Sequence, residues 1–442
     1  LIKLVSRGDT TVVDAYLSPI LRRYVDRVAA HIGEDKNSDD NTRLMFMQSN
    51  GGLTDANLFQ GKDSILSGPA GGVVGMVQTA AMAGFDNVIG FDMGGTSTDV
   101  SHFNGEYERE FETLVAGVRM RAPMMRIHTV AAGGGSILHF DGYRYRVGPD
   151  SAGADPGPAC YRRGGPLAVT DCNVMLGKIQ PQYFPPVFGA GADQPLDAEV
   201  VRAKFTDLAN QIGEATGSTP TPEDVAEGFL KIAIENMANA IKQISVQRGY
   251  DITHYTLNCF GGAGGQHACL VADSLGMTRV FLHPFAGVLS AYGMGLAHVR
   301  AIREHTIEAP LSTDLLSQLE IRLDELGTSA RAEVENQGVA AQDTQVVHKI
   351  HLRYEGTDSS LIINFGPMDD MVAEFEEAHY QQFGFNAPDR ARIVGTITAE
   401  AIGETGAVDD PEHKGTSAEE PAPLDTVTMY SGDEAHATPV YE

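Results

Sequence analysis

The sequence predicts an α/β fold with more than one lobe, and three observations support this. The chain has 442 residues, more than one hydrophobic core usually holds, so two or three domains are expected. Residues 88–101 have the pattern of a strand, a tight glycine turn and a second strand. Residues 255–275 have the pattern of a strand, a glycine loop and a helix, an arrangement that places ligands at strand ends.

The composition limits the partners and the compartment. The chain has 59 acidic and 32 basic residues, and a net charge of -27 argues against nucleic acid or an anionic membrane as partner. Four cysteines without a C-x-x-C pair indicate a reducing cytoplasm rather than a disulfide framework. There is no run of about 18 apolar residues and no signal-peptide pattern, so we expect a cytoplasmic protein. Because the chain begins with Leu1, we expect it to be part of something longer.

The N-terminal part alternates short apolar runs with turns. Residues 1–7 indicate a short strand and residues 8–10 a turn. Pro19 at a first helical position and Gly33 after the end then bound an amphipathic helix. A polar loop over 34–41 follows. The sequence next predicts a buried strand over 44–47, which ends in polar residues and two glycines.

Residues 88–101 have the most unusual composition in the chain. An apolar run ends on Asp92, a turn with two glycines and three hydroxyl side chains follows, and Asp99 opens a second alternating stretch. Glycines let the backbone press its N–H groups against an anion, and hydroxyls add further donors. The turn is therefore a candidate phosphate loop, with these ligands: Gly94, Gly95, Thr96, Ser97 and Thr98.

The two acids of this segment need a different role. Because like charges repel, we expect Asp92 and Asp99 to hold a hydrated Mg²⁺ or to orient a water rather than to bind phosphate. The turn is not a Walker A loop, which ends in Gly-Lys-Ser/Thr, and a strand rather than the helix of a dinucleotide fingerprint follows it. A glycine hairpin that binds nothing is the alternative.

Other segments rich in small residues leave two interpretations open. Residues 67–72 lead into a helix over 73–83 and are either an anion site or a surface for close helix packing. His128 is either a core histidine or part of a ligand site, which the glycines at 133–135 favour. Residues 147–160 hold too much Pro and Gly for a helix or strand, which favours an ordered functional loop.

Helix starts are well marked in the middle of the chain. Asp171 and Asn173 compete as caps of a helix that begins at Val174. A short helix is predicted near 198–212. Thr221, followed by proline and two acids, begins a long helix that continues to about residue 249.

A second glycine loop lies at residues 260–267, between a strand and a helix. Bare backbone in such a loop lets a flat base or a ribose lie against it. Its candidate ligands are Gly261, Gly262, Gly264, Gly265 and Gln266. Two glycine loops of this kind in one chain favour nucleotide binding over packing alone.

The last third of the chain has a different character. The sequence predicts, in order, a strand over 279–282, a small-residue helix from about 283, a charged helix over 313–337, strands over 346–354 and 359–365, and a helix over 368–383. Residues 403–423 are acidic and Pro rich, as in a linker. Residues 426–441 then form a hairpin that is left without partners. Because a lone hairpin is marginal in water, the chain is expected to stop inside a β domain.

The two glycine segments, in this order, resemble the actin-like ATPase superfold, in which hairpin phosphate loops and an adenosine loop close on ATP. Within it, the motifs resemble the hydantoinase A/5-oxoprolinase family over nearly the whole chain. The matching stretches are SGPAGGVVG (67–75), GFDMGGTSTDVS (90–101), TVAAGGGS (129–136), VGPDSAGADPGPACY (147–161), FGGAGGQHAC (260–269), LRYEGTD (352–358) and TPVY (438–441). FGGAGGQHAC and LRYEGTD are more similar to 5-oxoprolinase than to N-methylhydantoinase or the acetone and acetophenone carboxylase subunits.

The resemblance implies an actin-like (ribonuclease H-like) α/β core, an additional α+β lobe and the start of a β domain. The implied divisions are part of the core at 1–85, the ATPase lobe at 86–300 with a phosphate loop at 90–101 and an adenosine loop at 260–267, the smaller lobe at 301–402, and a linker with an incomplete hairpin at 403–442. Family members carry an earlier Asp-Gly-Gly-Thr loop, which is not seen here. They also continue past TPVY, and 5-oxoprolinases add a hydantoinase B-like half.

The function that the resemblance implies is ATP-dependent hydrolysis of a cyclic amide, 5-oxo-L-proline to L-glutamate, through phosphorylation of the amide oxygen. Asp92 and Asp99 would manage Mg²⁺, with K⁺ or another divalent ion as a further candidate, and His128, Asp155 and Asp171 would lie near the substrate. The expected partner is a hydantoinase B-like domain or subunit in an oligomer. Without the earlier phosphate loop, this part alone is expected to have little activity.

Several alternatives stay open. The sister enzymes named above, an actin-like sugar kinase and a nucleotide-gated binding module share the superfold. One position departs from the family pattern, because His298 stands in Leu-Ala-His where the family often has Leu-Ala-Asp. Any acidic role at that position is therefore in doubt.

Overall fold

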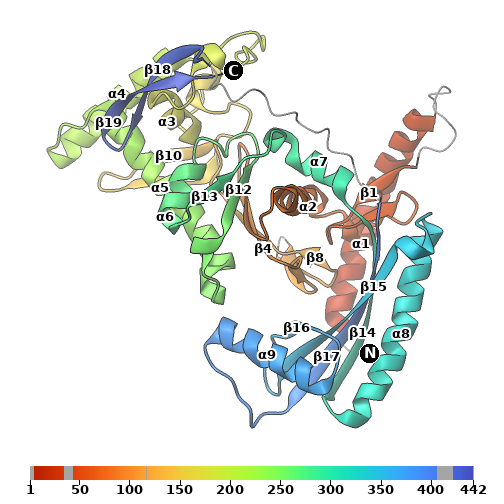
Figure 1. Cartoon of the computed structure of the whole chain (residues 1–442). Helices are drawn as coiled ribbons and strands as arrows, with labels where there is room; N and C mark the ends of the chain where they lie inside the picture. Colours follow the sequence, from red (N-terminus) through yellow and green to blue (C-terminus); the bar gives the residue numbers. More distant parts are fainter. Residues whose placement is uncertain (1–3, 34–42, 116, 406–421, 442) are drawn as a thin grey trace.

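The computed structural model describes residues 4–33, 43–115, 117–405 and 422–441 (Figure 1). The strands of these residues form a five-stranded sheet, a six-stranded sheet and four two-stranded ribbons. Helices pack against both larger sheets. The prediction of a mixed α/β fold is confirmed at this level. Among the same residues, no helix is both long and apolar enough to cross a bilayer.

The five-stranded sheet carries the first glycine turn. Its strand order is β13-β12-β3-β4-β9, with β12 parallel to β3 and β13, and β4 antiparallel to both neighbours. The strands are β3 (Asn87–Met93), β4 (Thr98–Asn104), β9 (Ile127–Val130), β12 (Thr256–Phe260) and β13 (Arg279–Phe281). The predicted strand, turn and strand over 88–101 are thus confirmed as the β3–β4 hairpin.

Helices cover both faces of this sheet, as the alternation of side chains along β3 requires. Ile89 and Phe91 are fully buried in the core formed with α5 (Pro222–Ile244). Gly90 points the other way, where a Cβ would lie 2.6 Å from Met76 Sδ of α2 (Ser67–Met82). Asp92, two residues along, therefore lies on the α2 face.

The start of α5 shows how local sequence fixes an element. The hydroxyl of Thr221 accepts a hydrogen bond from the Asp224 N–H at 3.1 Å, and the Asp224 carboxylate accepts from the Thr221 N–H at 2.8 Å. This reciprocal pair satisfies two donors that a helix start leaves free. The predicted start at Thr221 is confirmed.

The six-stranded sheet has the order β1-β2-β14-β17-β15-β16. Its strands are β1 (Met45–Met47), β2 (Leu53–Asp55), β14 (Val299–Pro310), β15 (Thr344–Tyr354), β16 (Leu361–Asn364) and β17 (Arg392–Gly403). Helices α8 (Thr313–Asn336) and α9 (Met368–Phe383) share one core with β15, β16 and β17 (Figure 1). Since β1 and β2 come from the N-terminal part, this sheet joins segments of the chain that are far apart in sequence. The domain division stays a prediction.

The remaining elements are short or peripheral. The other helices are α1 (Leu4–Gly33), α3 (Val169–Met175), α4 (Ala198–Thr216), α6 (Ala268–Leu275) and α7 (Leu289–Leu296). The 3-10 turns are η1 (Gly61–Asp63), η2 (Ala159–Tyr161), η3 (Pro181–Tyr183), η4 (Val246–Arg248), η5 (Ile252–His254), η6 (Ala286–Val288) and η7 (Ala341–Asp343). The ribbons pair β5 (Arg109–Glu110) with β8 (Met124–Met125), β6 (Thr113–Val115) with β7 (Val118–Met120), β10 (Ser136–Phe140) with β11 (Tyr145–Ser151), and β18 (Asp425–Ser431) with β19 (Glu434–Val440).

The C-terminal hairpin β18–β19 is confirmed, and it packs against the lobe of α3 and α5 (Figure 1). The Tyr430 N–H donates to the Leu176 carbonyl at 2.8 Å. The buried Glu227 carboxylate accepts from the N–H groups of Gly432 at 2.7 Å and Asp433 at 3.1 Å. These bonds correct the expectation of a hairpin without partners.

Some sequence predictions were wrong. Residues 4–10 are helical rather than a strand and turn, because α1 continues through Pro19. Residues 147–151 belong to β11, whose pairing with β10 shifts register and so accommodates Pro149. Helix α3 begins at Val169 rather than Val174. The loop at 34–41 and most of the linker at 403–423 fall outside the described residues.

A buried cluster of ion pairs joins the six-stranded sheet to the β5–β8 ribbon that follows β4. Arg109 of β5 and Arg300 of β14 both bind the Glu400 carboxylate of β17, at 2.9 and 2.7 Å. Burial alone would raise the pKa of Glu400, but the two guanidinium groups lower it below its usual value. Breaking such a pair on one side leaves a buried charge uncompensated. The cluster therefore fixes how the β4–β8 region meets the six-stranded sheet.

Helices α2 and α7 cross at unusually short distance, and this crossing generates a stability prediction. A Cβ on Gly293 would lie 2.1 Å from the Gly71 carbonyl oxygen and 2.4 Å from the Gly75 nitrogen. Because those atoms are backbone, Gly293→Ala should lower the free energy of unfolding by about 1–3 kcal/mol. Gly295 of the same helix has open space around it. Gly295→Ala is the control and should leave stability unchanged or raise it by up to about 1 kcal/mol. Urea unfolding of both variants measures this, and equal effects would contradict the packing interpretation.

Candidate functional site

The first glycine turn, residues 94–97, is a tight hairpin turn closed by a hydrogen bond from the Gly94 N–H to the Ser97 carbonyl at 3.0 Å. Gly95 and Thr96 are exposed. Among the described residues, no acceptor pairs the N–H groups of Gly95, Thr96 and Ser97. Free N–H groups on one turn are what an anion-binding loop requires.

Residues 133–135 press directly against this turn. The N–H groups of Gly134 and Gly135 donate to the carbonyls of Gly94 and Gly95, at 3.1 and 2.6 Å. A Cβ on Gly133 would lie 2.4 Å from the Thr96 carbonyl carbon. Backbone meets backbone here, so this three-glycine stretch packs closely against the turn at Thr96 and Ser97.

The hydroxyl residues of the turn differ in their availability. Thr98 is fully buried, and its Oγ1 donates to the Ala132 carbonyl at 2.6 Å. That hydroxyl therefore ties the β3–β4 hairpin to Ala132, the residue just before the three glycines, and is not free for a ligand. Thr96 and Ser97 keep at least part of their surface. They stay the better candidates for contact with a ligand.

Asp92 and Asp99 lie directly opposite each other on β3 and β4, so the structure brings the two predicted acids together. Asp99 Oδ1 is buried and has no hydrogen-bond partner among the described residues. Burial, and then the charge of Asp99, raise the pKa of Asp92 to about 6. A paired cation would relieve both effects, since it favours the charged form of each carboxylate.

The acid pair fits a Mg²⁺ ion that reaches the protein with a phosphate ligand. Magnesium often binds through one or two carboxylates, and takes its other ligands from water and phosphate oxygens. Within the described ranges, no group of three or more His, Cys, Asp and Glu side chains is arranged to hold a metal. The pair alone would therefore supply the protein ligands.

The second glycine loop, residues 260–267, lies beside the acid pair. Gly261 has a positive φ of 82°, and a Cβ there would lie 2.5 Å from Asp92 Oδ1. The Ala263 N–H donates to the Met93 carbonyl at 3.0 Å. Since β3 and β12 are parallel neighbours, their carboxyl ends bring the two glycine segments to one edge of the sheet.

The surfaces of this loop are divided between packing and solvent. Gly264 is buried, and a Cβ there would lie 2.6 Å from Cys259 Sγ. Gly262 and Gly265 are exposed, and Gln266 is half-buried with its Oε1 lacking a partner in the described chain. The side open to a ligand is therefore formed by Gly262, Gly265 and Gln266.

Helix α2 completes the surroundings of the acid pair. A Cβ on Gly72 would lie 2.9 Å from Ser290 Oγ of α7 and 3.6 Å from Asp92 Oδ2. Gly71 and Gly75 likewise face α7 at short distance. The glycines of α2 thus serve close helix packing, one of the two interpretations of residues 67–72. An anion at the helix start stays a prediction.

Sequence reasoning missed a buried contact between the second loop and α3. His267 is fully buried, and burial, followed by the charge of Lys178, lowers its pKa to about 3. The neutral ring accepts a hydrogen bond at Nε2 from Asn173 Nδ2 at 3.2 Å. Asn173 was considered only as a helix cap. The signal that could have identified His267 is its position directly between the loop and α6.

The other predicted catalytic residues do not join the acid pair. His128 pairs with Val100 in the β4–β9 ladder, so alternation points it to the face opposite Asp99. Asp155 is exposed in the loop after β11. Thr129, the cross-strand partner of Asp99, lies on the same face as the acids and was not singled out.

Asp171 has a structural position. It is fully buried, and its carboxylate accepts hydrogen bonds from the N–H groups of Ala159, Cys160 and Ala168 at 2.8–3.0 Å. Those bonds fix the loop that follows β11 against α3. With no exposed surface, Asp171 can position this loop but cannot touch a substrate.

His298, the departure noted in the sequence, follows α7. Its backbone carbonyl accepts from the Leu53 N–H at 2.8 Å, while its Nδ1 is buried and without a partner in the described chain. Burial lowers the pKa of this histidine, and the charge of Arg300 adds to the effect. A neutral ring therefore stands at this junction of α7 and β14.

The structure is thus an α/β protein in which two acids lie beside two glycine segments, and comparison with known proteins identifies its family. The chain belongs to the family described as Hydantoinase/oxoprolinase, whose profile matches residues 7–303. It is 41% identical to 5-oxoprolinase 1 of Arabidopsis thaliana and 42% identical to 5-oxoprolinase of Saccharomyces cerevisiae, each over 92% of this chain. The chain spans 33% and 32% of those proteins.

A solved structure is also similar. The crystal structure of the ATP-dependent caprolactamase from Pseudomonas jessenii matches 100% of this chain and 64% of its own, with a TM-score of 0.85 at 28% identity. The resemblance stated from the motifs is confirmed at the level of the family. The individual roles of the site residues stay predictions.

The raised pKa of Asp92 predicts how stability changes with pH. The folded state holds this proton more tightly than the unfolded state, whose pKa is near 3.8, so stability is lost as pH rises from about 4 to 6. A pKa near 6 in place of 3.8 corresponds to a loss of about 3 kcal/mol in the free energy of unfolding once the carboxyl is ionised. Asp92→Asn, studied without nucleotide and Mg²⁺, should therefore raise the free energy of unfolding by up to that amount above pH 6 and little below pH 4.

Urea unfolding between pH 4 and 7.5 measures this effect. Asp86→Asn is the matched control, because Asp86 is exposed just before the same strand. Its stability curve should follow that of the wild type. Parallel curves for all three proteins would show that the acid pair carries no electrostatic strain.

Proposed function

We propose that the full-length protein hydrolyses a cyclic amide with ATP, converting 5-oxo-L-proline to L-glutamate, and that this chain is its ATP-binding part. Membership of the Hydantoinase/oxoprolinase family and 41–42% identity to two 5-oxoprolinases support the substrate class. The observation that carries the proposal is the half-buried acid pair, Asp92 and Asp99, which lie directly opposite each other beside two glycine segments with free surfaces. Asp99 Oδ1 is buried and has no hydrogen-bond partner among the described residues.

The residues present fit Mg²⁺ and ATP. Asp92 and Asp99 would hold the hydrated ion, and the free N–H groups of residues 95–97 would receive phosphate oxygens. The open side of the second loop, at Gly262, Gly265 and Gln266, would face the adenosine. In this proposal the five-stranded sheet is the actin-like core. K⁺, or a divalent ion other than Mg²⁺, is a further candidate for the bound cation.

When bound, ATP would supply the phosphoryl group that, on the amide oxygen, ends the amide resonance and activates the amide carbon toward attack by water. The chain's own residues would position the nucleotide and stabilise its charge, which are the main contributions of a protein to phosphoryl transfer. The backing of the turn by residues 133–135 fixes its N–H groups, so little reorganisation is needed on binding. Asp92, which binds a proton up to about pH 6, would need to release it before holding the cation.

The activity also needs parts outside this chain. Because the chain spans about a third of the length of the matched 5-oxoprolinases, we propose a hydantoinase B-like domain or subunit as partner, in an oligomer. Four free cysteines, three of them buried, support a reducing cytoplasm. The isolated chain is expected to have little or no turnover.

The test is ATP hydrolysis by the full-length protein with Mg²⁺, with and without 5-oxo-L-proline. We expect hydrolysis that depends on 5-oxo-L-proline, and a loss of at least about 100-fold in kcat for Asp92→Asn and for Asp99→Asn, since each removes a metal ligand. Asp86→Asn, an exposed change next to the same strand, should keep the wild-type rate.

Other outcomes would point elsewhere. Stimulation only by caprolactam, a hydantoin or a ketone would assign the chain to a sister enzyme of the family. Stimulation only by sugars would favour a kinase. Tight nucleotide binding without stimulation by any small molecule would favour a nucleotide-gated module, and full activity of Asp92→Asn would remove the acid pair from the mechanism.

A further inference from the structure

A charged cleft lies apart from the two glycine segments, where α1 meets β14. It has a volume of about 580 Å³. Its walls come from α1, η1, β14 and the residue that follows β7, and they are lined by Arg7, Thr10, Thr11, Asp14, Lys62, Arg121, Glu304, His305 and Thr306. All nine side chains are polar or charged. Such a lining suits a small, water-soluble, charged ligand rather than an apolar one.

Arg121 is the central cation of this cleft. Its side chain is only 8% exposed, and Nε binds Glu304 Oε1 at 3.0 Å while Nη2 lies 3.4 Å from Thr306 Oγ1. Its Nη1 is buried and has no hydrogen-bond partner among the described residues. Leaving a charged donor unpaired is costly, and a carboxylate is the ligand that matches a guanidinium best.

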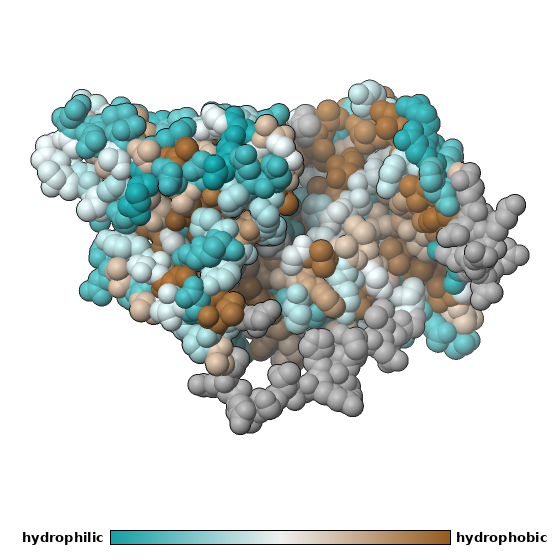
Figure 2. Space-filling model, turned by 90° about the horizontal axis from the view of Figure 1, so that it is seen from above, coloured by the Kyte–Doolittle hydropathy of each residue, from teal (hydrophilic) through white to brown (hydrophobic). Residues whose placement is uncertain are grey.

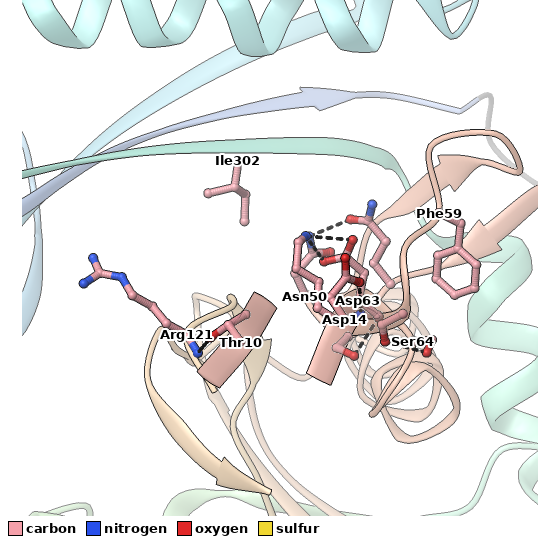
Figure 3. Close-up of polar contacts among 12 residues, drawn as sticks. Thr10, Asp14, Asn50, Phe59, Asp63, Ser64, Arg121 and Ile302 are labelled. Carbon is pink, nitrogen blue, oxygen red and sulfur yellow. Dashed lines mark hydrogen bonds and ion pairs between the residues drawn. The ribbon is translucent and has the colours of Figure 1, made fainter. Parts of the chain in front are cut away.

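The backbone also holds Arg121 in place. Its N–H donates to Thr10 Oγ1 at 2.8 Å (Figure 3). The Thr10 hydroxyl in turn donates to the Ser6 carbonyl one turn earlier on α1. Arg7, which lies one turn before Thr10 on α1, also lines the cleft. The two guanidinium groups outnumber the single carboxylate of Glu304 there, so this end favours an anion.

The other end of the cleft presents a carboxylate. Asp14 Oδ1 accepts from the Lys62 N–H at 2.9 Å and from Ser18 Oγ at 3.1 Å, which fixes the side chain and leaves Oδ2 without a partner in the described chain. The Lys62 ammonium is already bound by Asp63 at 2.7 Å. Figure 3 shows Thr10 and Arg121 on one side and Asp14 with Asp63 on the other. The free acceptor at this end suits an N–H group.

We propose that this cleft binds a small molecule that carries a carboxylate next to an N–H group, either an α-amino acid or its cyclic amide. The carboxylate would contact Arg121 with Arg7 nearby, and the N–H group would contact Asp14. The inference rests on the proposed function, because the substrate and the product of that reaction both have this chemistry.

The cleft is connected to the acid pair through α2. Lys62 lies five residues before the start of this helix at Ser67, and Gly72, about 8 Å further along its axis, faces Asp92. A ligand that fixes α1 against η1 would therefore act on the segment that leads to the acid pair.

Calorimetric titration of the full-length protein without nucleotide tests the site with three probes: 5-oxo-L-proline, L-glutamate and 2-pyrrolidinone, which has the lactam but no carboxylate. We expect at least one of the acids to bind, and Arg121→Gln to weaken its binding about 10- to 100-fold, the usual effect of losing a charged hydrogen bond. Binding of 2-pyrrolidinone should be weak and unchanged. Which acid binds more tightly separates a substrate site from a product site.

Two further variants separate binding from folding. Arg119→Gln is the matched control, since Arg119 lies two residues earlier with its side chain 51% exposed, and it should bind as the wild type. Glu304→Gln breaks the same ion pair as Arg121→Gln but keeps the guanidinium, so binding of the acid should be unchanged or tighter. Equal weakening by both changes would mean that Arg121 only holds the fold, and would overturn the proposal.

The remaining outcomes are also decisive. Wild-type affinity in Arg121→Gln, or no binding of either acid to the wild type, overturns the site. If ATP hydrolysis responds to 5-oxo-L-proline while Arg121→Gln binds normally, the proposed function stands and this inference fails. If Arg121→Gln weakens acid binding but no lactam stimulates ATP hydrolysis, the site stands and the proposed function fails.

Discussion

The close approach of backbone to backbone around the Asp92–Asp99 pair is the constraint on which this structure depends. Residues 133–135 bond to the first glycine turn, Gly261 approaches Asp92, and Gly72 fills the space between α7 and the acids. None of these contacts leaves room for a side chain. Three segments far apart in sequence are therefore glycine rich because backbone approaches closely there: residues 133–135 against the turn, Gly261 against Asp92, and α2 against α7.

Elements determined by local chemistry could be predicted from the sequence. The β3–β4 hairpin follows from its alternation and glycines, and α5 from the cap at Thr221. The meeting of the two glycine segments was implied by the resemblance to the actin-like superfold, and it is the structure that shows both at strand ends of one sheet. For the site, the pairing of Asp92 with Asp99 could be predicted, since both flank the same tight turn.

The rest depends on contacts between distant segments. Helix α1 continues through Pro19, although the local pattern at this proline predicts a helix start. The continuation follows the helical spacing of the side chains of Thr10, Val13, Leu17 and Leu21. Strand β17 pairs with β14 on one side and with β15 on the other, and β14 lies about 90 residues earlier in the chain. Asp171 looked like a cap or a catalytic acid. It does accept from the Ala168 N–H at the start of α3, but its other N–H partners, Ala159 and Cys160, lie 12 and 11 residues away. The cleft at Arg121 needs α1, η1 and β14 together, so no single motif marks it.

Charge links the two candidate sites. A chain with a net charge of -27 repels anions at long range, so an anionic ligand must be held by local groups. At the acid pair those groups are backbone N–H donors and a cation that arrives with the ligand, because two carboxylates alone would repel phosphate. At the cleft they are guanidinium groups that belong to the protein. A phosphate site that takes its cation from solution depends on Mg²⁺, whereas a carboxylate site built on Arg121 does not, so the two would respond differently to removal of the metal.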